Sequence, residues 1–298
     1  MQTLFVVLGP TGVGKTQLCI RLAQHIGSPI INADSRQIFA ELPIGTAAPT
    51  REEQCEVKHY FVGNHHLQDY YSASRYEQDV LHLLCTELSS LPAVLLTGGS
   101  MMYIDAVCYG IDDIPTVDEA TRAWMKSRLQ QEGLDALVEE LRQLDPVHFE
   151  EIDRKNPRRV VHALEICHMT GKPYSSFRTH SRKPRPFRVV KIGLDRPREQ
   201  LYSRINQRVL DMMDRGLLDE ARSVYPQRGV NALNTVGYKE LFAFFDGVLP
   251  LEEAIRQIQS NTRQYMRKQL TWFRKQTDIQ WFNPDNIEEI INYIDDNR

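Results

Sequence analysis

The sequence lacks the features that mark several large classes of protein. Its five cysteines are scattered and form no C-x-x-C pair, so they indicate neither a disulfide framework nor a zinc site. No apolar run approaches the roughly 18–20 residues that a membrane-spanning helix needs, and no signal-peptide pattern precedes the first apolar run. The net charge of −3 excludes a uniformly basic protein, so any nucleic-acid contact must come from local basic patches. We expect a reduced, cytoplasmic protein.

What remains is an ordinary globular composition. Of 298 residues, 42% are hydrophobic and 25% are charged, which is enough apolar content for a sizeable core. No internal repeat and no low-complexity tract is visible. The length fits one large domain or a core that carries an insertion.

The first third of the chain alternates between two patterns. Short, continuous apolar runs at 3–8, 29–33 and 93–97 are typical of buried parallel strands. The intervening segments 17–26 and 71–90 have apolar residues at helical spacing. Strand, helix and strand in alternation predict an α/β fold with a parallel sheet flanked by helices.

The pattern changes near Pro115, where strands give way to helices. Three helices are expected at 120–131, 134–144 and 158–170, and Gly171 ends the last of them. A basic, proline-containing stretch follows at 178–188. Strand character returns at 188–194, and helices are predicted at 198–224, 236–245 and 251–274. We therefore predict a discontinuous core domain, residues 1–115 and 186–298, with an all-helical insertion domain at residues 116–185.

The strongest local signal follows the first predicted strand. It is an eight-residue G-x-x-x-x-G-K-[ST] motif, formed by Gly9, Pro10, Thr11, Gly12, Val13, Gly14, Lys15 and Thr16. Its glycines allow the backbone N–H groups to wrap phosphate oxygens, and the following helix adds its positive dipole end. Lys15 supplies a full charge, and the Thr16 hydroxyl is placed to ligate Mg²⁺. The motif, with a strand before it and a helix after it, predicts a P-loop NTPase-like core that binds a di- or triphosphate.

Nucleotide-hydrolysing P-loop proteins usually also hold Mg²⁺ with a carboxylate at the end of a second strand. The strand at 93–97 is followed by Gly98, Gly99 and Ser100 and has no such carboxylate. Asp34 instead follows the strand at 29–33, and strand ends of one sheet meet at one edge. From its position alone, Asp34 could be a metal ligand, a general base on a second substrate, or the cap of a local turn.

The ordered motifs resemble one family, the tRNA dimethylallyltransferases (tRNA isopentenyltransferases), in its compact, bacterial-type form. The resemblance runs over nearly the whole chain and is carried by Gly9–Thr16, Asp34–Phe39, Gly45–Ala47, Gly98–Tyr103, Arg159 with Ala163–Glu165, Arg204–Arg208, Gly216–Glu220, Val236–Lys239, Thr262–Gln264, Lys268–Gln269 and Thr271–Arg274. The P-loop alone is shared by many families, whereas this ordered set is specific.

The resemblance implies a prenyl transfer. The dimethylallyl group of dimethylallyl diphosphate would pass to N6 of the adenosine 3′ of the anticodon in a tRNA, and diphosphate would leave. It implies that the P-loop residues 9–16 and Arg208 bind the donor's diphosphate, with Mg²⁺ held through Thr16. The implied catalytic residues are Asp34 as general base, Thr16 and Arg208.

The same resemblance assigns a tRNA-binding set, which we expect to contact the anticodon stem-loop. Its members are Asp34, Ser35, Arg36, Gln37, Ser100, Arg122, Arg158, Arg159, Val160, Val161 and His162. Ser100 stands where threonine is more usual, and His162 where arginine is common. The basic residues between Arg178 and Lys191 could track RNA phosphates or form an exposed linker. The aromatic residues Tyr265, Trp272 and Phe273 are expected in the core.

Two other classes of function fit the P-loop. A small-molecule or nucleoside kinase would share the fold, the Mg²⁺ and a base at Asp34, and it would consume ATP. A nucleotide-dependent RNA-binding switch would need a sensor for the γ-phosphate, for which the sequence offers no convincing residue. We expect a transferase that acts as a monomer without a membrane partner.

Overall fold

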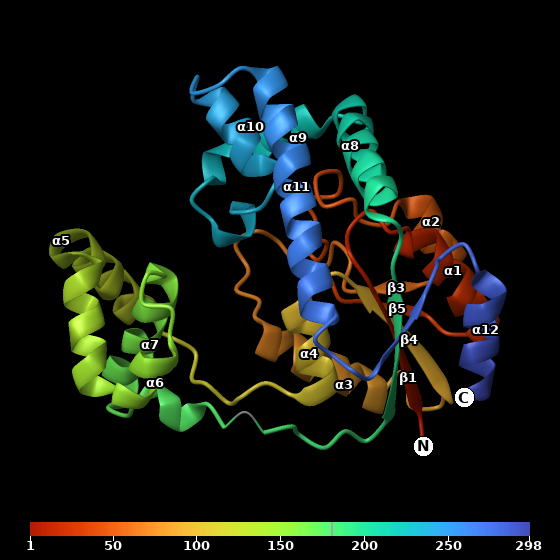
Figure 1. Cartoon of the computed structure of the whole chain (residues 1–298), viewed down its shortest axis with the longest axis horizontal. Helices are drawn as coiled ribbons and strands as arrows, with labels where there is room; N and C mark the ends of the chain where they lie inside the picture. Colours follow the sequence, from red (N-terminus) through yellow and green to blue (C-terminus); the bar gives the residue numbers. More distant parts are fainter. Residues whose placement is uncertain (180) are drawn as a thin grey trace. The chain divides into compact units, whose positions relative to one another are not determined.

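The computed structural model describes residues 1–179 and 181–298, and the described chain forms two compact units. One unit contains residues 1–109 and 184–298, and the other contains residues 110–183. The boundaries predicted from the sequence, at 115 and 186, lie close to these positions, and residue 180 of the predicted insertion lies outside the described residues. Figure 1 shows both units.

The larger unit is built on a parallel sheet. Within the described residues it has six strands in the order β3-β2-β4-β1-β5-β6, and every neighbouring pair is parallel. Their bounds are β1 Thr3–Leu8, β2 Ile30–Asn32, β3 His59–Tyr60, β4 Ala93–Gly98, β5 Arg188–Leu194 and β6 Ile279–Phe282. This confirms the predicted α/β class, and it places the strand ends that precede residues 9, 33 and 99 along one edge of the sheet.

Helices cover both faces of the sheet (Figure 1). Residues of α1 and α12 pack on one face, and residues of α3, α4 and the end of α11 pack on the other. The helix bounds are α1 Lys15–Ile26, α2 Arg51–Glu56, α3 Ala73–Cys85, α4 Met101–Tyr109, α11 Leu251–Phe273 and α12 Ile287–Asp296. The central strand β1 is fully buried, as its uninterrupted apolar sequence requires.

A second apolar cluster lies beyond the carboxyl edge of the sheet. It joins the segment after β2, represented by Ile38 and Leu42, to the helices α8 Arg198–Asp214, α9 Leu217–Val224, α10 Tyr238–Phe245 and α11. The prediction of one helix at 198–224 was wrong. The chain breaks at Gly216, whose φ of 97° favours glycine, and this break turns α9 away from α8.

The smaller unit is helical and has its own core. Its helices are α5 Glu119–Leu144, α6 Pro146–Glu151 and α7 Pro157–Thr170, with a 3₁₀ turn at Tyr174–Phe177. Gly133 has φ 81° inside α5 and divides it, as the two helices predicted at 120–131 and 134–144 imply. Met125, Leu137 and Leu164 are fully buried between these helices.

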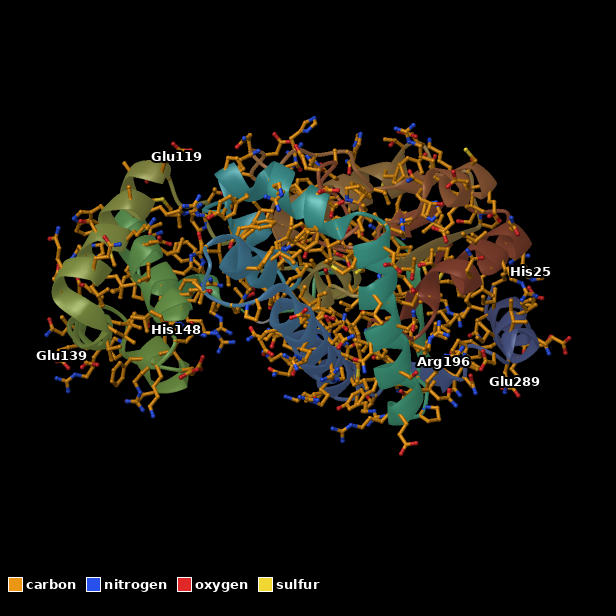
Figure 2. All side chains as sticks on the ribbon, turned by 90° about the horizontal axis from the view of Figure 1, so that it is seen from above. His25, Glu119, Glu139, His148, Arg196 and Glu289 are labelled. Carbon is orange, nitrogen blue, oxygen red and sulfur yellow. The ribbon has the colours of Figure 1, made fainter. Side chains whose placement is uncertain are left out.

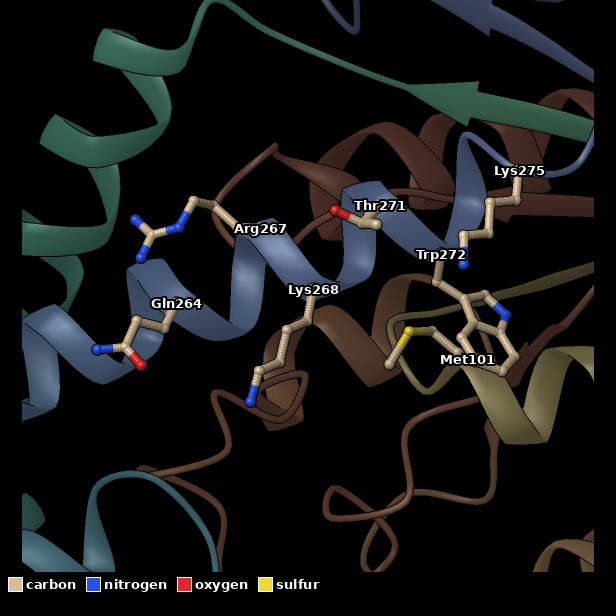
Figure 3. A pocket seen from close by; sticks show the side chains of 7 residues that line it. All are labelled: Met101, Gln264, Arg267, Lys268, Thr271, Trp272 and Lys275. Carbon is tan, nitrogen blue, oxygen red and sulfur yellow. The ribbon is translucent and has the colours of Figure 1, made fainter. Parts of the chain in front are cut away.

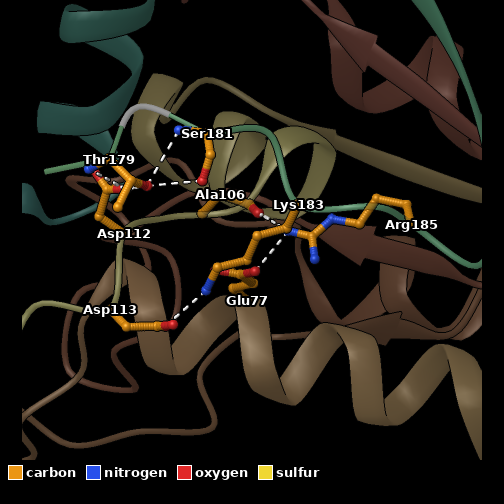
Figure 4. Close-up of polar contacts among 8 residues, drawn as sticks. All are labelled: Glu77, Ala106, Asp112, Asp113, Thr179, Ser181, Lys183 and Arg185. Atoms are coloured by element: carbon orange, nitrogen blue, oxygen red, sulfur yellow. Dashed lines mark hydrogen bonds and ion pairs between the residues drawn. The ribbon is translucent and has the colours of Figure 1, made fainter. Parts of the chain in front are cut away.

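The two segments that lead into and out of the smaller unit are held by polar contacts (Figure 4). Within that unit Asp112 accepts hydrogen bonds from the backbone and hydroxyl of Thr179, and Lys183 forms an ion pair with Asp113 at 2.7 Å. In the larger unit Arg185 forms a buried ion pair with Glu77 at 2.6 Å.

Two basic residues between Arg178 and Lys191 are buried, so they fit neither a run of RNA phosphate contacts nor an exposed linker. Arg185 is almost fully buried, and Lys191 is 2% exposed and bonded to Gln276 at 2.6 Å. Neither side chain can follow an RNA backbone, because each is committed to an internal partner.

No helix among residues 1–179 and 181–298 is long and apolar enough to cross a membrane.

Candidate active site

The P-loop has the backbone geometry that its glycines predict. Gly12 and Gly14 have φ of 84° and 106°, and Gly14 caps the start of α1. A Cβ on Gly12 would lie 2.9 Å from Cγ1 of Ile205, so glycine is also required by the packing of α8. The Lys15 ammonium donates hydrogen bonds to the carbonyls of Gly9 and Pro10, both at 2.9 Å. Lys15 therefore lies folded over the loop.

Arginines from the segment after β5 surround the same loop. Arg204 donates through Nε to the Gly12 carbonyl at 2.8 Å, and Arg196 donates to the Val13 carbonyl at 2.9 Å. Arg196, labelled in Figure 2, is fixed by a two-pronged ion pair with Asp285 at 2.5 Å. Arg208 lies within 3.3 Å of the Thr11 hydroxyl. Together with Lys15, these residues make the loop a strongly positive site suited to a polyanion.

The crowding of positive charge changes the proton affinity of the loop lysine. The pKa of Lys15 is lowered from 10.5 to about 8, mainly by burial and then by the Arg208 guanidinium, while the Asp34 carboxylate opposes the shift. Burial also lowers the pKa of Arg208. Both cations are thus held in a poorly solvated place, where a bound anion interacts more strongly than in water.

Asp34 lies two strands away from the P-loop on the same edge. It follows β2, and its Oδ1 accepts the backbone N–H groups of Arg36 at 2.9 Å and Gln37 at 3.4 Å. These bonds form the local turn that the sequence allowed. The second oxygen, Oδ2, lies on the side of Gly99. Because β4 separates β1 from β2, the two strand ends are about 10 Å apart, given the usual spacing of about 4.8 Å between strands.

The neighbours of Asp34 in the predicted tRNA-binding set lie beside it. Ser100 accepts the backbone N–H of Ser35 at 2.8 Å and donates to its hydroxyl at 3.1 Å. Arg36 donates to the Thr235 hydroxyl at 2.6 Å, and Gln37 donates to the Thr46 and Ala47 carbonyls at 3.0 Å. The structure therefore brings Ser100 and the 34–37 turn into one network.

One cavity joins the P-loop to this network. It has a volume of about 940 Å³, and its walls include Thr11–Thr16 apart from Val13, together with Asp34–Gln37 and residues 97–100. Helices α8, α9 and α11 also contribute to the wall. Their charged, polar and apolar side chains there are Arg204, Arg208, Met212, Leu217, Ile258, Tyr265 and Gln269. Lysine, arginine and carboxylate side chains thus share a single space with an apolar wall.

The other predicted tRNA-binding residues lie in the smaller unit. Arg122 is exposed on α5, and Arg158 and Arg159 are exposed at the start of α7. His162 is partly exposed, with Nδ1 at 3.4 Å from Glu165, and Val161 is partly buried. Val160 is fully buried in the core of this unit, so its side chain is not available for a surface contact.

Sequence reasoning missed several residues of the site. Arg196 and Gln269 reach the P-loop from 183 and 258 positions away, and no local pattern marks such contacts. The prediction that Tyr265 and Trp272 belong to the core was wrong, because they are 38% and 41% exposed, whereas Phe273 is buried. Met101, placed near the site by its motif, lines a separate groove.

That separate groove follows one face of α11 (Figure 3). It has a volume of about 500 Å³ and is lined by Met101, Gln264, Arg267, Lys268, Thr271, Trp272 and Lys275. Five of these residues lie on α11, where spacings of three and four put them on one exposed side of the helix, and Lys275 follows the helix. The groove carries three cations and an indole ring.

The fold and the cavity define a class of protein: a P-loop α/β protein whose phosphate-binding loop and a carboxylate line the same cavity. Comparison with known proteins then gives the family. A family profile described as IPP transferase matches residues 37–276, and the chain belongs to this family.

Relatives and solved structures agree with this placement. The chain is 60% identical over 292 residues to tRNA dimethylallyltransferase 1 of Phocaeicola vulgatus, covering 98% of this chain and 97% of the relative. It is 56% identical over 294 residues to tRNA dimethylallyltransferase 2 of Parabacteroides distasonis, covering 99% and 98%. A solved tRNA isopentenylpyrophosphate transferase of Bacillus halodurans is 33% identical, with a TM-score of 0.72 and coverage of 99% and 96%.

Proposed function

We propose that this protein transfers the dimethylallyl group of dimethylallyl diphosphate to N6 of the adenosine 3′ of the anticodon in tRNA. The observation that carries the proposal is the shared cavity, in which a cationic P-loop and the Asp34 carboxylate meet. Membership of the IPP transferase family supports prenyl transfer rather than a kinase or a nucleotide switch. The names of the relatives support tRNA as the acceptor.

The donor's diphosphate lies on the P-loop in this proposal. Loop N–H groups and the start of α1 bind its oxygens, while Lys15 and Arg208 neutralise the charge that grows as the C1–O bond breaks. Thr16 lies on the cavity wall as the second residue of α1, where its hydroxyl fits one ligand position of Mg²⁺. Bound Mg²⁺ would neutralise the leaving diphosphate further.

The acceptor approaches from the side of Asp34. The N6 amine is a weak nucleophile because its lone pair is delocalised into the purine, so loss of its proton must accompany bond formation. The N6–C1 bond forms, the C1–O bond breaks, and Asp34 takes the N6 proton as general base. A spacing of about 10 Å between the two strand ends accommodates the diphosphate and the reacting atoms between them.

The RNA is proposed to bind outside the cavity with one base turned into it. Unstacking an anticodon-loop base costs little, and a flipped base can then be read by Ser100 and the 34–37 turn. We assign phosphate contacts to Arg122, Arg158 and Arg159 in residues 110–183, and to the groove on α11. We further propose that the enzyme is monomeric and acts in the cytoplasm.

Labelled substrates test this function directly. Purified protein is incubated with Mg²⁺, dimethylallyl diphosphate labelled in the prenyl group, and unmodified tRNA, with ATP omitted. We expect label in the tRNA, and nuclease mapping should place it on the adenosine 3′ of the anticodon. Label that appears only when ATP is added, or that maps to another nucleotide, contradicts the proposal.

A further inference from the structure

One buried glutamine connects the two sides of the active-site cavity. Gln269 lies on α11 and is 1% exposed, so both ends of its amide must find partners inside the protein. Its Oε1 accepts the backbone N–H of Thr11 at 2.9 Å, and its Nε2 donates to the carbonyl of Gly99 at 2.8 Å. A single side chain therefore joins the loop after β1 to the loop after β4.

The Gly99 end of this bridge is next to the proposed base. A Cβ on Gly99 would lie 2.6 Å from Nε2 of Gln269 and 3.9 Å from Oδ2 of Asp34, so Gln269 packs tightly against Gly99 and the Asp34 carboxylate lies nearby. The following residue, Ser100, accepts the N–H of Ser35 at 2.8 Å. A chain of contacts thus runs from the P-loop through Gln269 to the turn that holds Asp34.

The polarity of the bridge is specific. Thr11 presents a donor and Gly99 presents an acceptor, so a neutral side chain with one acceptor and one donor is required. The Tyr265 hydroxyl lies 3.5 Å from the same Gly99 carbonyl, which is too long to replace the amide. An ionised carboxylate at this position would satisfy Thr11 and repel the Gly99 carbonyl.

We propose that Gln269 is a positioning residue that sets the distance between the donor's diphosphate and the base for the acceptor amine. This inference rests on the proposed transfer function. Gln269 touches neither reacting group and acts through the two loops. Transfer between two bound substrates depends steeply on their separation, and a displacement of about 1 Å can cost on the order of 10²-fold in rate.

The sharpest test is Gln269→Glu, assayed for transfer of dimethylallyl to tRNA at several pH values. Near pH 8 the new carboxylate repels the Gly99 carbonyl, and kcat should fall at least about tenfold. Burial raises the pKa of a carboxyl group, and its protonated form again has one donor and one acceptor. The ratio of variant to wild-type kcat should therefore rise several-fold between pH 8 and pH 6.

Dividing the two pH profiles removes the titration of groups that both proteins share. Ionisable groups near the bridge include Lys15 on the P-loop, Arg208 beside Thr11, Asp34 on the side of Gly99, and Tyr265, which contacts Gln269. Gln257→Glu is the matched control. Gln257 lies on the same helix, donates to Glu253 at 3.2 Å and is no part of the cavity wall. The ratio of Gln257→Glu kcat to wild-type kcat should therefore not change with pH.

A second variant covers the case in which the buried carboxyl prevents folding. Gln269→Leu introduces no charge, and we expect kcat to fall about tenfold or more at every pH, with the KM for the donor changed less than about threefold. Two results would overturn the positioning role alone, provided that the wild-type protein transfers label. One is an unchanged kcat in Gln269→Leu, and the other is a ratio of Gln269→Glu kcat to wild-type kcat that does not change with pH. A wild-type protein that transfers no label overturns the proposed function and this inference with it.

Discussion

Asp34 combines a structural role in a turn with the role of general base that we propose for it. Its Oδ1 is occupied by the N–H groups of Arg36 and Gln37, so the carboxylate is fixed in direction. Oδ2 lies on the side of Gly99, and both Asp34 and Gly99 line the cavity. A fixed carboxylate loses little entropy when an acceptor amine arrives, and this is the arrangement that a general base needs.

Replacing Asp34 separates these two roles. Asp34→Asn keeps an oxygen for the turn and removes the base, so we expect kcat to fall by a factor on the order of 10²–10⁴ while the Kd for tRNA stays nearly constant. Single-turnover transfer and filter binding measure the two quantities. A wild-type single-turnover rate in this variant would remove Asp34 from the chemistry.

Lys15 should make donor binding depend on pH. With its pKa lowered to about 8, Lys15 loses its charge in the free protein as the pH rises through that value. The KM for the donor should therefore be constant below about pH 7 and increase above pH 8. Because bound diphosphate favours the charged form, binding near pH 8.5 should take up a proton, which calorimetry in buffers of different ionisation enthalpy detects.

The Lys15→Ala variant is the control for this prediction. It should raise the KM for the donor by about tenfold to a hundredfold, the value of a charge-assisted hydrogen bond, and it should also lower the transfer rate. It should abolish the proton uptake. Unchanged donor dependence in Lys15→Ala would argue against the P-loop as the diphosphate site.

The burial of His148 on helix α6 should make the stability of the smaller unit depend on pH. His148, labelled in Figure 2, is buried between Asp145 and Tyr174, and its pKa is lowered by burial and by the charge of Arg178. Arg159 lowers this pKa as well, while Asp145 and Glu151 oppose the shift. A neutral folded histidine contributes stability above its unfolded pKa of about 6.5, and this contribution is lost as the pH falls below that value.

Hydrogen exchange tests this expectation within the full chain. Protection of α6 and α7 amides, corrected for intrinsic exchange, should decline from pH 7 to pH 5 in the wild-type protein. His148→Gln should remove most of this decline, whereas His82→Gln, an exposed position on α3, should not. An equal decline in all three proteins would show that His148 is not responsible.

The sequence predicted some elements well because their signals are local. The strands at 3–8 and 188–194 were predicted to the residue, because both are short and rich in the β-branched residues that strands favour. β3 and β6 were missed because they have two and four residues and carry mixed polarity. The break at Gly216 was missed because the apolar spacing of α8 and α9 continues across it.

The arrangement of the chain as a whole could be predicted only in part. The P-loop, Asp34 and Ser100 were found because motifs and strand ends mark them. The bridge through Gln269 and the ion pair of Arg196 with Asp285 depend on contacts between distant segments, which no periodicity reveals. The burial of Lys191 was missed for the same reason, because its partner Gln276 lies 85 positions away.

In the proposed reaction, the P-loop holds the diphosphate of a prenyl donor, and the prenyl group passes to RNA without nucleotide hydrolysis. A doubly labelled donor, with ¹⁴C in the prenyl group and ³²P in the diphosphate, measures this in one reaction with tRNA and without ATP. The account predicts that ¹⁴C enters the tRNA in a one-to-one ratio with the ³²P-diphosphate released. Entry of ³²P into the acceptor, or a requirement for ATP, would contradict it.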